Sequence, residues 1–128
     1  MTDATYARGV QIRHEMFGKE ATDAQLADAD GFMGRLQDLV TGYCFGENWG
    51  REQLPRNIRS MITIAMLAGQ GREPEIRVHV RGALANGVSR EEIGEVFLHA
   101  AVYAGVPAAV SGFRAANEVF AEIDSAAS

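Results

Sequence analysis

The sequence predicts an all-α protein, for three reasons. Apolar residues recur at the three-to-four-residue spacing of helices, and no segment keeps the alternation of a half-buried strand for long. Proline or a capping residue precedes several of these segments, and glycine follows several of them. The abundance of Ala and Gly is consistent with close approach between helices. We therefore expect a helical bundle.

The first third of the chain predicts two helices and a loop. Residues 4–17 predict a modest helix, and residues 22–43 predict a longer one whose middle is weakened by Gly31 and Gly34. Residues 42–55, GYCFGENWGREQLP, contain three glycines and end in proline, which predicts a loop.

This predicted loop is rich in aromatic residues, namely Tyr43, Phe45 and Trp49. Aromatic side chains in a loop must pack against something. Trp49 therefore suits either a lid over the core or the wall of a pocket.

Proline and glycine mark the two central helices. Pro55 suits the first turn of a third helix, and the following RNIRSMITIAMLAGQG is apolar on nearly every side from Met61 to Ala68, as in a central buried helix. Gly69 and Gly71 end it. Pro74 begins the fourth helix, and Asn86-Gly87 ends it.

The last two helices also have local start signals. Ser89 and Glu92 form an S-x-x-E capping box before a fifth helix that begins near Arg90 and reaches Gly105. We accordingly interpret Glu92 as a capping residue rather than a catalyst. Pro107 opens the last helix, and the tail DSAAS is expected to fray.

Composition bounds the class of protein. The 128 residues predict a single domain spanning 1–128. Seventeen acidic against twelve basic side chains argue against nucleic acid as a partner. No apolar stretch approaches the length of a membrane span, and no signal-peptide pattern opens the chain. Cys44 is the only cysteine, which excludes an internal disulfide and favours a cytoplasmic location.

Polar residues on the three central helices are the candidates for function. Arg56, Arg59 and Thr63 share one side of the third helix, and His79 lies at the edge of the fourth helix's apolar face. Glu95 and His99 are one turn apart on the fifth. If these sets converge, they offer a cation, a proton-moving group and a carboxylate, which suits acid–base chemistry on a small anion. The chain has no cysteine cluster or spaced histidine set for a metal, and we expect no cofactor.

Each candidate also has a structural interpretation. Arg59 can bridge helices or subunits, and His79 can be a hydrogen-bonded core histidine. Glu95 and His99 can be an exposed helical pair. Arg77 and Arg81 flank the apolar stripe of the fourth helix, so we expect both to be solvated.

Four stretches together resemble the carboxymuconolactone decarboxylase family: the Trp49 loop, LPRNIRSMITIAML at 54–67, HVRGALANGVSREEIGEV at 79–96, and YAGVPAA at 103–109. The resemblance implies an alkyl-hydroperoxidase-D-like bundle of about six helices, assembled as a homo-oligomer, with a trimer or hexamer expected. Redox proteins of that fold carry a CxxC pair one turn before the family histidine. Arg72 and Glu75 stand at those positions here, so thiol chemistry is not expected.

The resemblance also implies a reaction: cofactor-free decarboxylation of 4-carboxymuconolactone to 3-oxoadipate enol-lactone, in the β-ketoadipate pathway of aromatic catabolism. It gives His79 the role of proton delivery or oxyanion contact, Arg59 anion binding, and Glu95 the orientation of a partner group. We expect the other substrate-binding residues to include a partly dry wall and flanking polar groups, namely Trp49, Met66, Phe97, Arg56, Thr63 and His99.

Some residues depart from the family pattern. His99 stands where glutamine is usual, and Phe45 stands where tryptophan is common. A different lactone or keto acid therefore stays open as the substrate. Two further alternatives are a non-catalytic oligomeric protein that binds a small molecule and a thiol-independent antioxidant protein, although the lone cysteine argues against the second.

Overall fold

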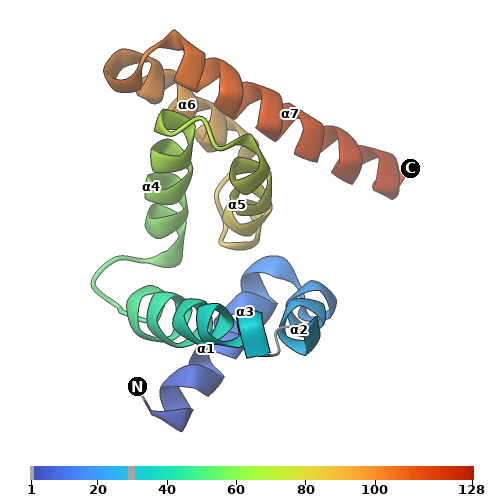
Figure 1. The fold of residues 1–128 in the computed structure, drawn as a ribbon. Helices are drawn as coiled ribbons and strands as arrows, with labels where there is room; N and C mark the ends of the chain where they lie inside the picture. Colours follow the sequence, from blue (N-terminus) through green and yellow to red (C-terminus); the bar gives the residue numbers. More distant parts are fainter. Residues whose placement is uncertain (1, 29–30) are drawn as a thin grey trace. The chain divides into compact units, whose positions relative to one another are not determined.

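The computed structural model describes residues 2–28 and 31–128, and every regular element in these two ranges is a helix (Figure 1). The predicted all-α class is therefore confirmed. By their contacts, the helices form two compact units, Met1–Pro55 and Arg56–Ser128. Each unit is described by itself below, and the expectation of a single domain stays a prediction.

The first unit contains α1 (Asp3–Phe17), α2 (Lys19–Asp28), α3 (Gly31–Asp38) and the π-helix η1 (Leu39–Trp49). The predicted helix over 22–43 is therefore wrong in extent, because α2, α3 and the start of η1 cover it. Residues 29–30, which fall inside that prediction, lie outside the described part of the chain. The predicted loop over 42–55 is wrong up to Trp49, which ends the π-helix.

The glycines that suggested a loop instead permit close packing of two helices. A Cβ atom on Gly46 would lie 2.3 Å from the backbone oxygen of Thr5, and one on Gly9 would lie 1.9 Å from that of Thr41. Side chains at these positions would push α1 and η1 apart. Two of the three aromatic residues find partners within this unit, since Phe45 stacks on Trp49 with ring centroids 5.8 Å apart, whereas Tyr43 is 58% exposed.

A buried arginine links the helices of the first unit. Arg13 on α1 is only 4% exposed. Its Nη1 donates to Gln37 Oε1 (2.9 Å) and Thr41 Oγ1 (2.8 Å), and its Nη2 donates to Gln25 Oε1 (2.5 Å). Burial lowers the pKa of this guanidinium. Neutral acceptors from α2, α3 and η1 thus compensate part of the cost of burying the charge.

The second unit contains α4 (Arg56–Gly69), α5 (Glu73–Ala85), α6 (Arg90–Ala104) and α7 (Val106–Ala127). The local start signals are confirmed. Pro74 lies in the first turn of α5, and Ser89 and Glu92 make both capping-box bonds, at 3.0 and 2.9 Å. The prediction of a frayed tail is wrong, because α7 continues to Ala127. Asp124 is held there by a bidentate pair with Arg90 at 2.7 and 3.1 Å.

The core of the second unit lies among all four of its helices. Phe97 of α6 is fully buried, and Gly112 of α7 makes room for its ring, since a Cβ there would lie 2.4 Å from Phe97 Cδ1. The expectation that α4 is buried on nearly every side is wrong for the described chain. Ile64 is buried, whereas Ile62 is 40% and Met66 62% exposed. One side of α4 therefore faces the core and another faces outward.

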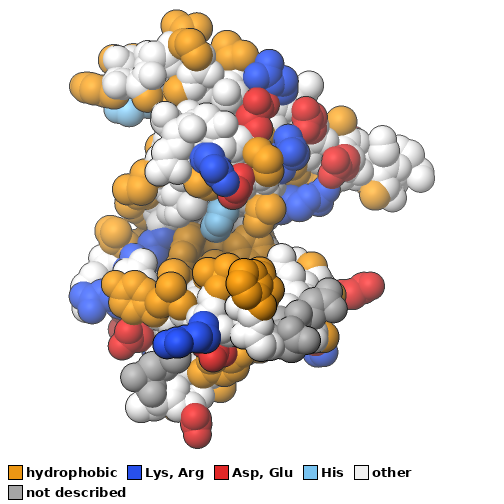
Figure 2. All heavy atoms as spheres, in the orientation of Figure 1, with side chains coloured by type: hydrophobic (Ala, Val, Ile, Leu, Met, Phe, Trp, Pro, Cys, Tyr) orange, Lys and Arg blue, Asp and Glu red, His pale blue; other side chains and the backbone are white. Residues whose placement is uncertain are grey.

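Ion pairs connect α5 to α7 on the surface of the second unit. Arg77 pairs with Glu118 at 3.1 Å and Arg81 with Glu122 at 2.5 Å, so these two arginines are half-exposed but paired rather than merely solvated. Figure 2 shows basic and acidic side chains intermixed along this part of the surface. Such exposed pairs are each worth at most about 1 kcal/mol. No helix in the described ranges is both long and apolar enough to cross a membrane.

Candidate functional site

The antiparallel hairpin of α4 and α5 carries three of the predicted site residues. One side-chain bond joins the two helices, because Asn86 Nδ2 at the end of α5 donates to Ser60 Oγ in α4 (3.0 Å), while Arg72 N caps the end of α4 by donating to the Leu67 oxygen (3.0 Å). Thr63 and Arg59 are one turn apart on the same side of α4.

His79 lies at the edge of a buried helix face. Its neighbours one residue and one turn away, Val80 and Ile76, are fully buried, whereas the imidazole is half-buried. Burial lowers the pKa of His79 below its ordinary value of 6.5, because desolvation disfavours the charged imidazolium. At neutral pH the ring is therefore mostly neutral, with one nitrogen donating and the other accepting.

An ion pair occupies the first turn of α5, one turn before His79. Arg72 Nη2 donates to Glu75 Oε1 at 2.5 Å, and this bond holds the pKa of Glu75 below its usual range. By the resemblance drawn from the sequence, these are the positions expected to hold the two cysteines in redox proteins of the implied fold. A charged pair in place of a dithiol leaves no disulfide chemistry here.

The arginines and the threonine of α4 differ in their ability to bind a ligand. Arg56 begins the helix, and both it and Arg59 are half-buried. The Thr63 hydroxyl donates to the Arg59 backbone oxygen at 2.8 Å, which is a bond within the helix. That bond occupies the Thr63 proton, so its oxygen can only accept. Of the three polar side chains on this side of α4, the two arginines are the ones that could bind an anion.

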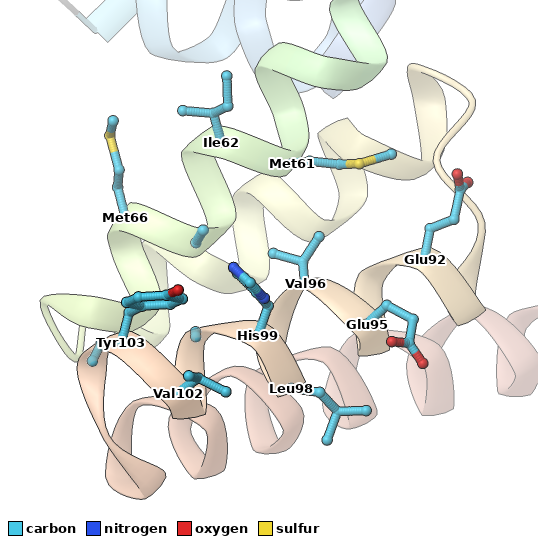
Figure 3. Close-up of a pocket in the computed structure, with 13 residues that line it drawn as sticks. Met61, Ile62, Met66, Glu92, Glu95, Val96, Leu98, His99, Val102 and Tyr103 are labelled. Carbon is cyan, nitrogen blue, oxygen red and sulfur yellow. The ribbon is translucent and has the colours of Figure 1, made fainter.

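A groove runs between α4 and α6 in the same unit, with a volume of about 910 Å³ (Figure 3). Its walls are mostly apolar, and they include three predicted site residues, Met66, Glu95 and His99. Figure 3 shows His99 projecting from α6 toward α4 while the Glu95 carboxylate points away from it. The His99 ring instead lies against Tyr103, with centroids 5.2 Å apart.

The electrostatic character of the groove is acidic. Glu92 and Glu95 are among the residues that line it, and these include no lysine or arginine. Within the described part of the chain, Glu95 has no hydrogen-bond or ion-pair partner. The described geometry therefore shows no pair between Glu95 and His99, which was one of the two interpretations of these residues. A groove of this kind disfavours a ligand that carries several carboxylates.

The remaining predicted site residues lie in the two cores. Phe97 is buried against Phe113, with ring centroids 5.9 Å apart, and it does not line the groove. Trp49 belongs to the first unit, where it is buried at the end of η1. Within the second unit, the predicted site residues thus form a hairpin group, a groove group and one core residue, Phe97, and their convergence on one site stays a prediction.

Sequence reasoning did not single out Tyr103, which also lines the groove. Tyr103 is 82% exposed and packs against His99. The i, i+4 spacing of the two rings on one helix was the signal that could have identified it.

As for metals, the described ranges contain no cluster of three or more His, Cys, Asp or Glu side chains that could hold an ion.

Comparison with known proteins gives consistent results. The sequence profile of the Carboxymuconolactone decarboxylase family matches residues 34–118. The chain is 37% identical over 118 residues to the 4-carboxymuconolactone decarboxylase of Acinetobacter baylyi, covering 92% of this chain and 88% of the relative. It is also 37% identical over 105 residues to the nitrosuccinic acid decarboxylase npaB of Metarhizium robertsii, covering 82% of this chain and 73% of that protein.

Proposed function

Because this chain belongs to the carboxymuconolactone decarboxylase family, we propose that it is a cofactor-free carboxy-lyase that converts 4-carboxymuconolactone to 3-oxoadipate enol-lactone. The observation that carries the proposal is the 37% identity to a 4-carboxymuconolactone decarboxylase over 92% of the chain. The reaction belongs to aromatic catabolism, and we propose a cytoplasmic location because a chain with one cysteine needs no oxidising compartment.

The substrate supplies its own electron sink. Its departing carboxylate is attached to a ring carbon that is conjugated, through a carbon–carbon double bond, to the lactone carbonyl. Loss of carbon dioxide leaves an electron pair that spreads onto the carbonyl oxygen as a dienolate, and a proton then adds to the ring carbon beside the carbonyl. The protein must bind the acetate arm, donate hydrogen bonds to the developing oxyanion and supply the proton.

The α4–α5 hairpin suits these tasks better than the groove. Arg59 offers a fixed positive charge for the acetate arm, and His79 offers an N–H for the oxyanion. The lowered pKa of His79 supports the neutral form, whose N–H is a good hydrogen-bond donor but a poor acid. We therefore assign His79 to oxyanion contact and propose that a water molecule delivers the proton to the ring carbon. The acidic groove would repel the same substrate.

A second substrate is favoured by a specific observation, the similarity to a nitrosuccinic acid decarboxylase. Nitrosuccinic acid and 4-carboxymuconolactone share one arrangement. In each, the carbon that can lose a carboxylate also carries an acetate arm and is joined to an electron sink, which is a nitro group in one and an unsaturated lactone in the other. An arginine for the arm and a donor for the sink would serve both compounds.

The test is an assay of carbon dioxide release by the purified full-length chain, with each of the two compounds and with a chelator present or absent. Rapid release from 4-carboxymuconolactone, unchanged by the chelator, is the expected result. Release from nitrosuccinic acid alone would transfer the proposal to that substrate. No release from either compound would contradict both and would favour another acid or a binding protein.

A further inference from the structure

A second cavity lies in the first unit, between the first half of α1 and the end of η1. Its volume is about 570 Å³, which is within the range of pockets that hold small molecules. Unlike the groove of the second unit, it has a mainly polar lining. None of its residues is among those assigned to the proposed reaction. Six polar side chains line it: Thr5, Arg8, Tyr43, Glu47, Asn48 and Arg51.

The π-helical winding of η1 brings three of these side chains to one side of the helix. The backbone bonds of a π-helix join residues five apart, so each turn holds more residues than a turn of an α-helix. Glu47 and Asn48, four and five positions after Tyr43, therefore both lie on the side of Tyr43. Segments with this winding are rare, and they occur frequently at functional sites. The winding is thus a second indication, besides the polar lining, that the cavity has a function.

Arg8 is fixed at the edge of the cavity and keeps most of its donors available. Its Nη2 donates to the Gly50 backbone oxygen at 2.6 Å, and a Cβ atom on Gly50 would lie only 2.9 Å from Arg8 Nε. The guanidinium therefore lies against the bare backbone of Gly50. A guanidinium has five N–H donors, and Arg8 uses one of them within the described part of the chain. The others can bind a carboxylate.

Opposite charges line the cavity without neutralising each other. Arg8 and Arg51 are positive and Glu47 is negative. Among the described residues, Glu47 has no hydrogen-bond or ion-pair partner, so it does not pair with Arg8. A simple anion in the cavity would be repelled by Glu47, and a simple cation would be repelled by the two arginines. A ligand that carries both charges can pair with both kinds of group.

We propose that this cavity binds a small polar α-amino acid in its zwitterionic form. The carboxylate of the ligand accepts hydrogen bonds from Arg8, and its ammonium group pairs with Glu47. The Asn48 amide and the Thr5 hydroxyl can each donate and accept, which suits a polar side chain on the ligand. The ring of Tyr43, which is 58% exposed, forms an outer wall.

The experiment is isothermal titration calorimetry of the full-length chain with three compounds that differ in their charged groups. L-Glutamine has both groups, glutaramate lacks the ammonium group, and 4-aminobutanamide lacks the carboxylate. We expect L-glutamine to bind with a dissociation constant at least about tenfold lower than that of either analogue, because each analogue leaves one protein charge without a partner. The titrations contain no lactone, so their outcome is independent of the proposed decarboxylation.

Two variants test the two ends of the ligand separately. Arg8→Gln should weaken the binding of L-glutamine and leave that of 4-aminobutanamide nearly unchanged. Glu47→Gln should weaken the binding of L-glutamine but not that of glutaramate. Arg35→Gln is the matched control, because Arg35 is an exposed arginine of α3 that does not line the cavity. Arg8→Gln also removes the bond to Gly50, whereas Glu47→Gln removes no hydrogen bond within the described chain, so it tests the proposal even if Arg8→Gln fails to fold.

Three results would overturn the proposal. No heat of binding with L-glutamine at millimolar concentrations would exclude the site. Equal affinity for L-glutamine and glutaramate would show that Glu47 binds no ammonium group and that the cavity takes simple anions. Equal weakening by Arg35→Gln and Arg8→Gln would show a general effect of charge on the whole chain rather than a contact in the cavity.

Discussion

Replacing His79 tests the chemical assignment most directly. If the neutral imidazole donates its N–H to the developing oxyanion, His79→Ala removes one preorganised donor. Loss of one such donor lowers kcat by roughly 10²- to 10³-fold. His79→Gln keeps an N–H donor of similar reach and should retain part of the rate. The assay is carbon dioxide release from 4-carboxymuconolactone at saturating substrate, which separates kcat from KM.

The pH profile distinguishes the two roles of this histidine. Its pKa is lowered by burial, so the neutral form predominates above that value and the imidazolium below it. An oxyanion contact by the neutral ring predicts a rate that falls as pH drops through the lowered pKa. Delivery of a proton by the imidazolium predicts the opposite, a rate that falls as pH rises through it. The other charged groups near this turn of the hairpin, Arg59, Arg72 and Glu75, would be unchanged in the variants.

Stability offers a readout that needs no substrate. Because the folded-state pKa is lowered, the contribution of His79 is fully present above the unfolded value of about 6.5 and is lost as pH falls through the folded pKa. Thermal melts of His79→Gln should lack this part of the pH dependence. His14→Ala is a matched control, since His14 is half-buried in an ion pair with Asp23 in the first unit. Full activity of His79→Ala, with only its melting temperature lowered, would refute the assignment and return His79 to a core role.

Three further variants give distinct signatures. Arg59→Ala should raise KM for the lactone by about tenfold or more with a smaller effect on kcat, because the lost charge binds the acetate arm; an unchanged KM in steady-state kinetics would contradict this. Glu92→Ala should cost about 1 kcal/mol in denaturant unfolding and leave kcat intact, because Glu92 closes the capping box with Ser89. Gly112→Ala should destabilise by about 1–3 kcal/mol, because the added Cβ would lie 2.4 Å from the Phe97 ring; a wild-type unfolding midpoint would show that the ring can move aside.

The parts of the fold that were predictable from the sequence depend on local signals. Pro74 and the Ser89–Glu92 capping box act on the turn in which they lie, so their helices begin where the sequence indicated. The π-helix was not predictable in this way. Its glycines looked like a loop because the reason for them, contact with the backbone of α1 at Thr5, comes from a residue about forty positions away.

The same limit applies to the candidate site. Helical periodicity identified Phe97 as apolar and inward-facing, but it cannot tell a core from a pocket wall. The Phe97 ring fits into the core because Gly112 has no side chain there, and Gly112 lies on another helix, far from Phe97 in the sequence. Periodicity likewise put Glu95 and His99 on one side of α6, yet a shared side requires no contact, and the two side chains diverge.

The outward side of α4 connects this limit to the expected assembly of the chain as a homo-oligomer. The sequence is apolar on nearly every side from Met61 to Ala68, which is typical of a helix with neighbours all around, yet Met66 is 62% exposed in the single chain. The apolar residues of a helix indicate which of its sides are buried in the protein as it exists in solution. Those sides can be buried by a partner chain as well as by other helices of the same chain. A second copy seated on the groove would cover Ile62 and Met66 together with α6. If Ile62→Glu weakened association in sedimentation and left the unfolding of the monomer unchanged, the apolar pattern of α4 would be explained by assembly. If it unfolded the monomer instead, the pattern would belong to a contact within the chain.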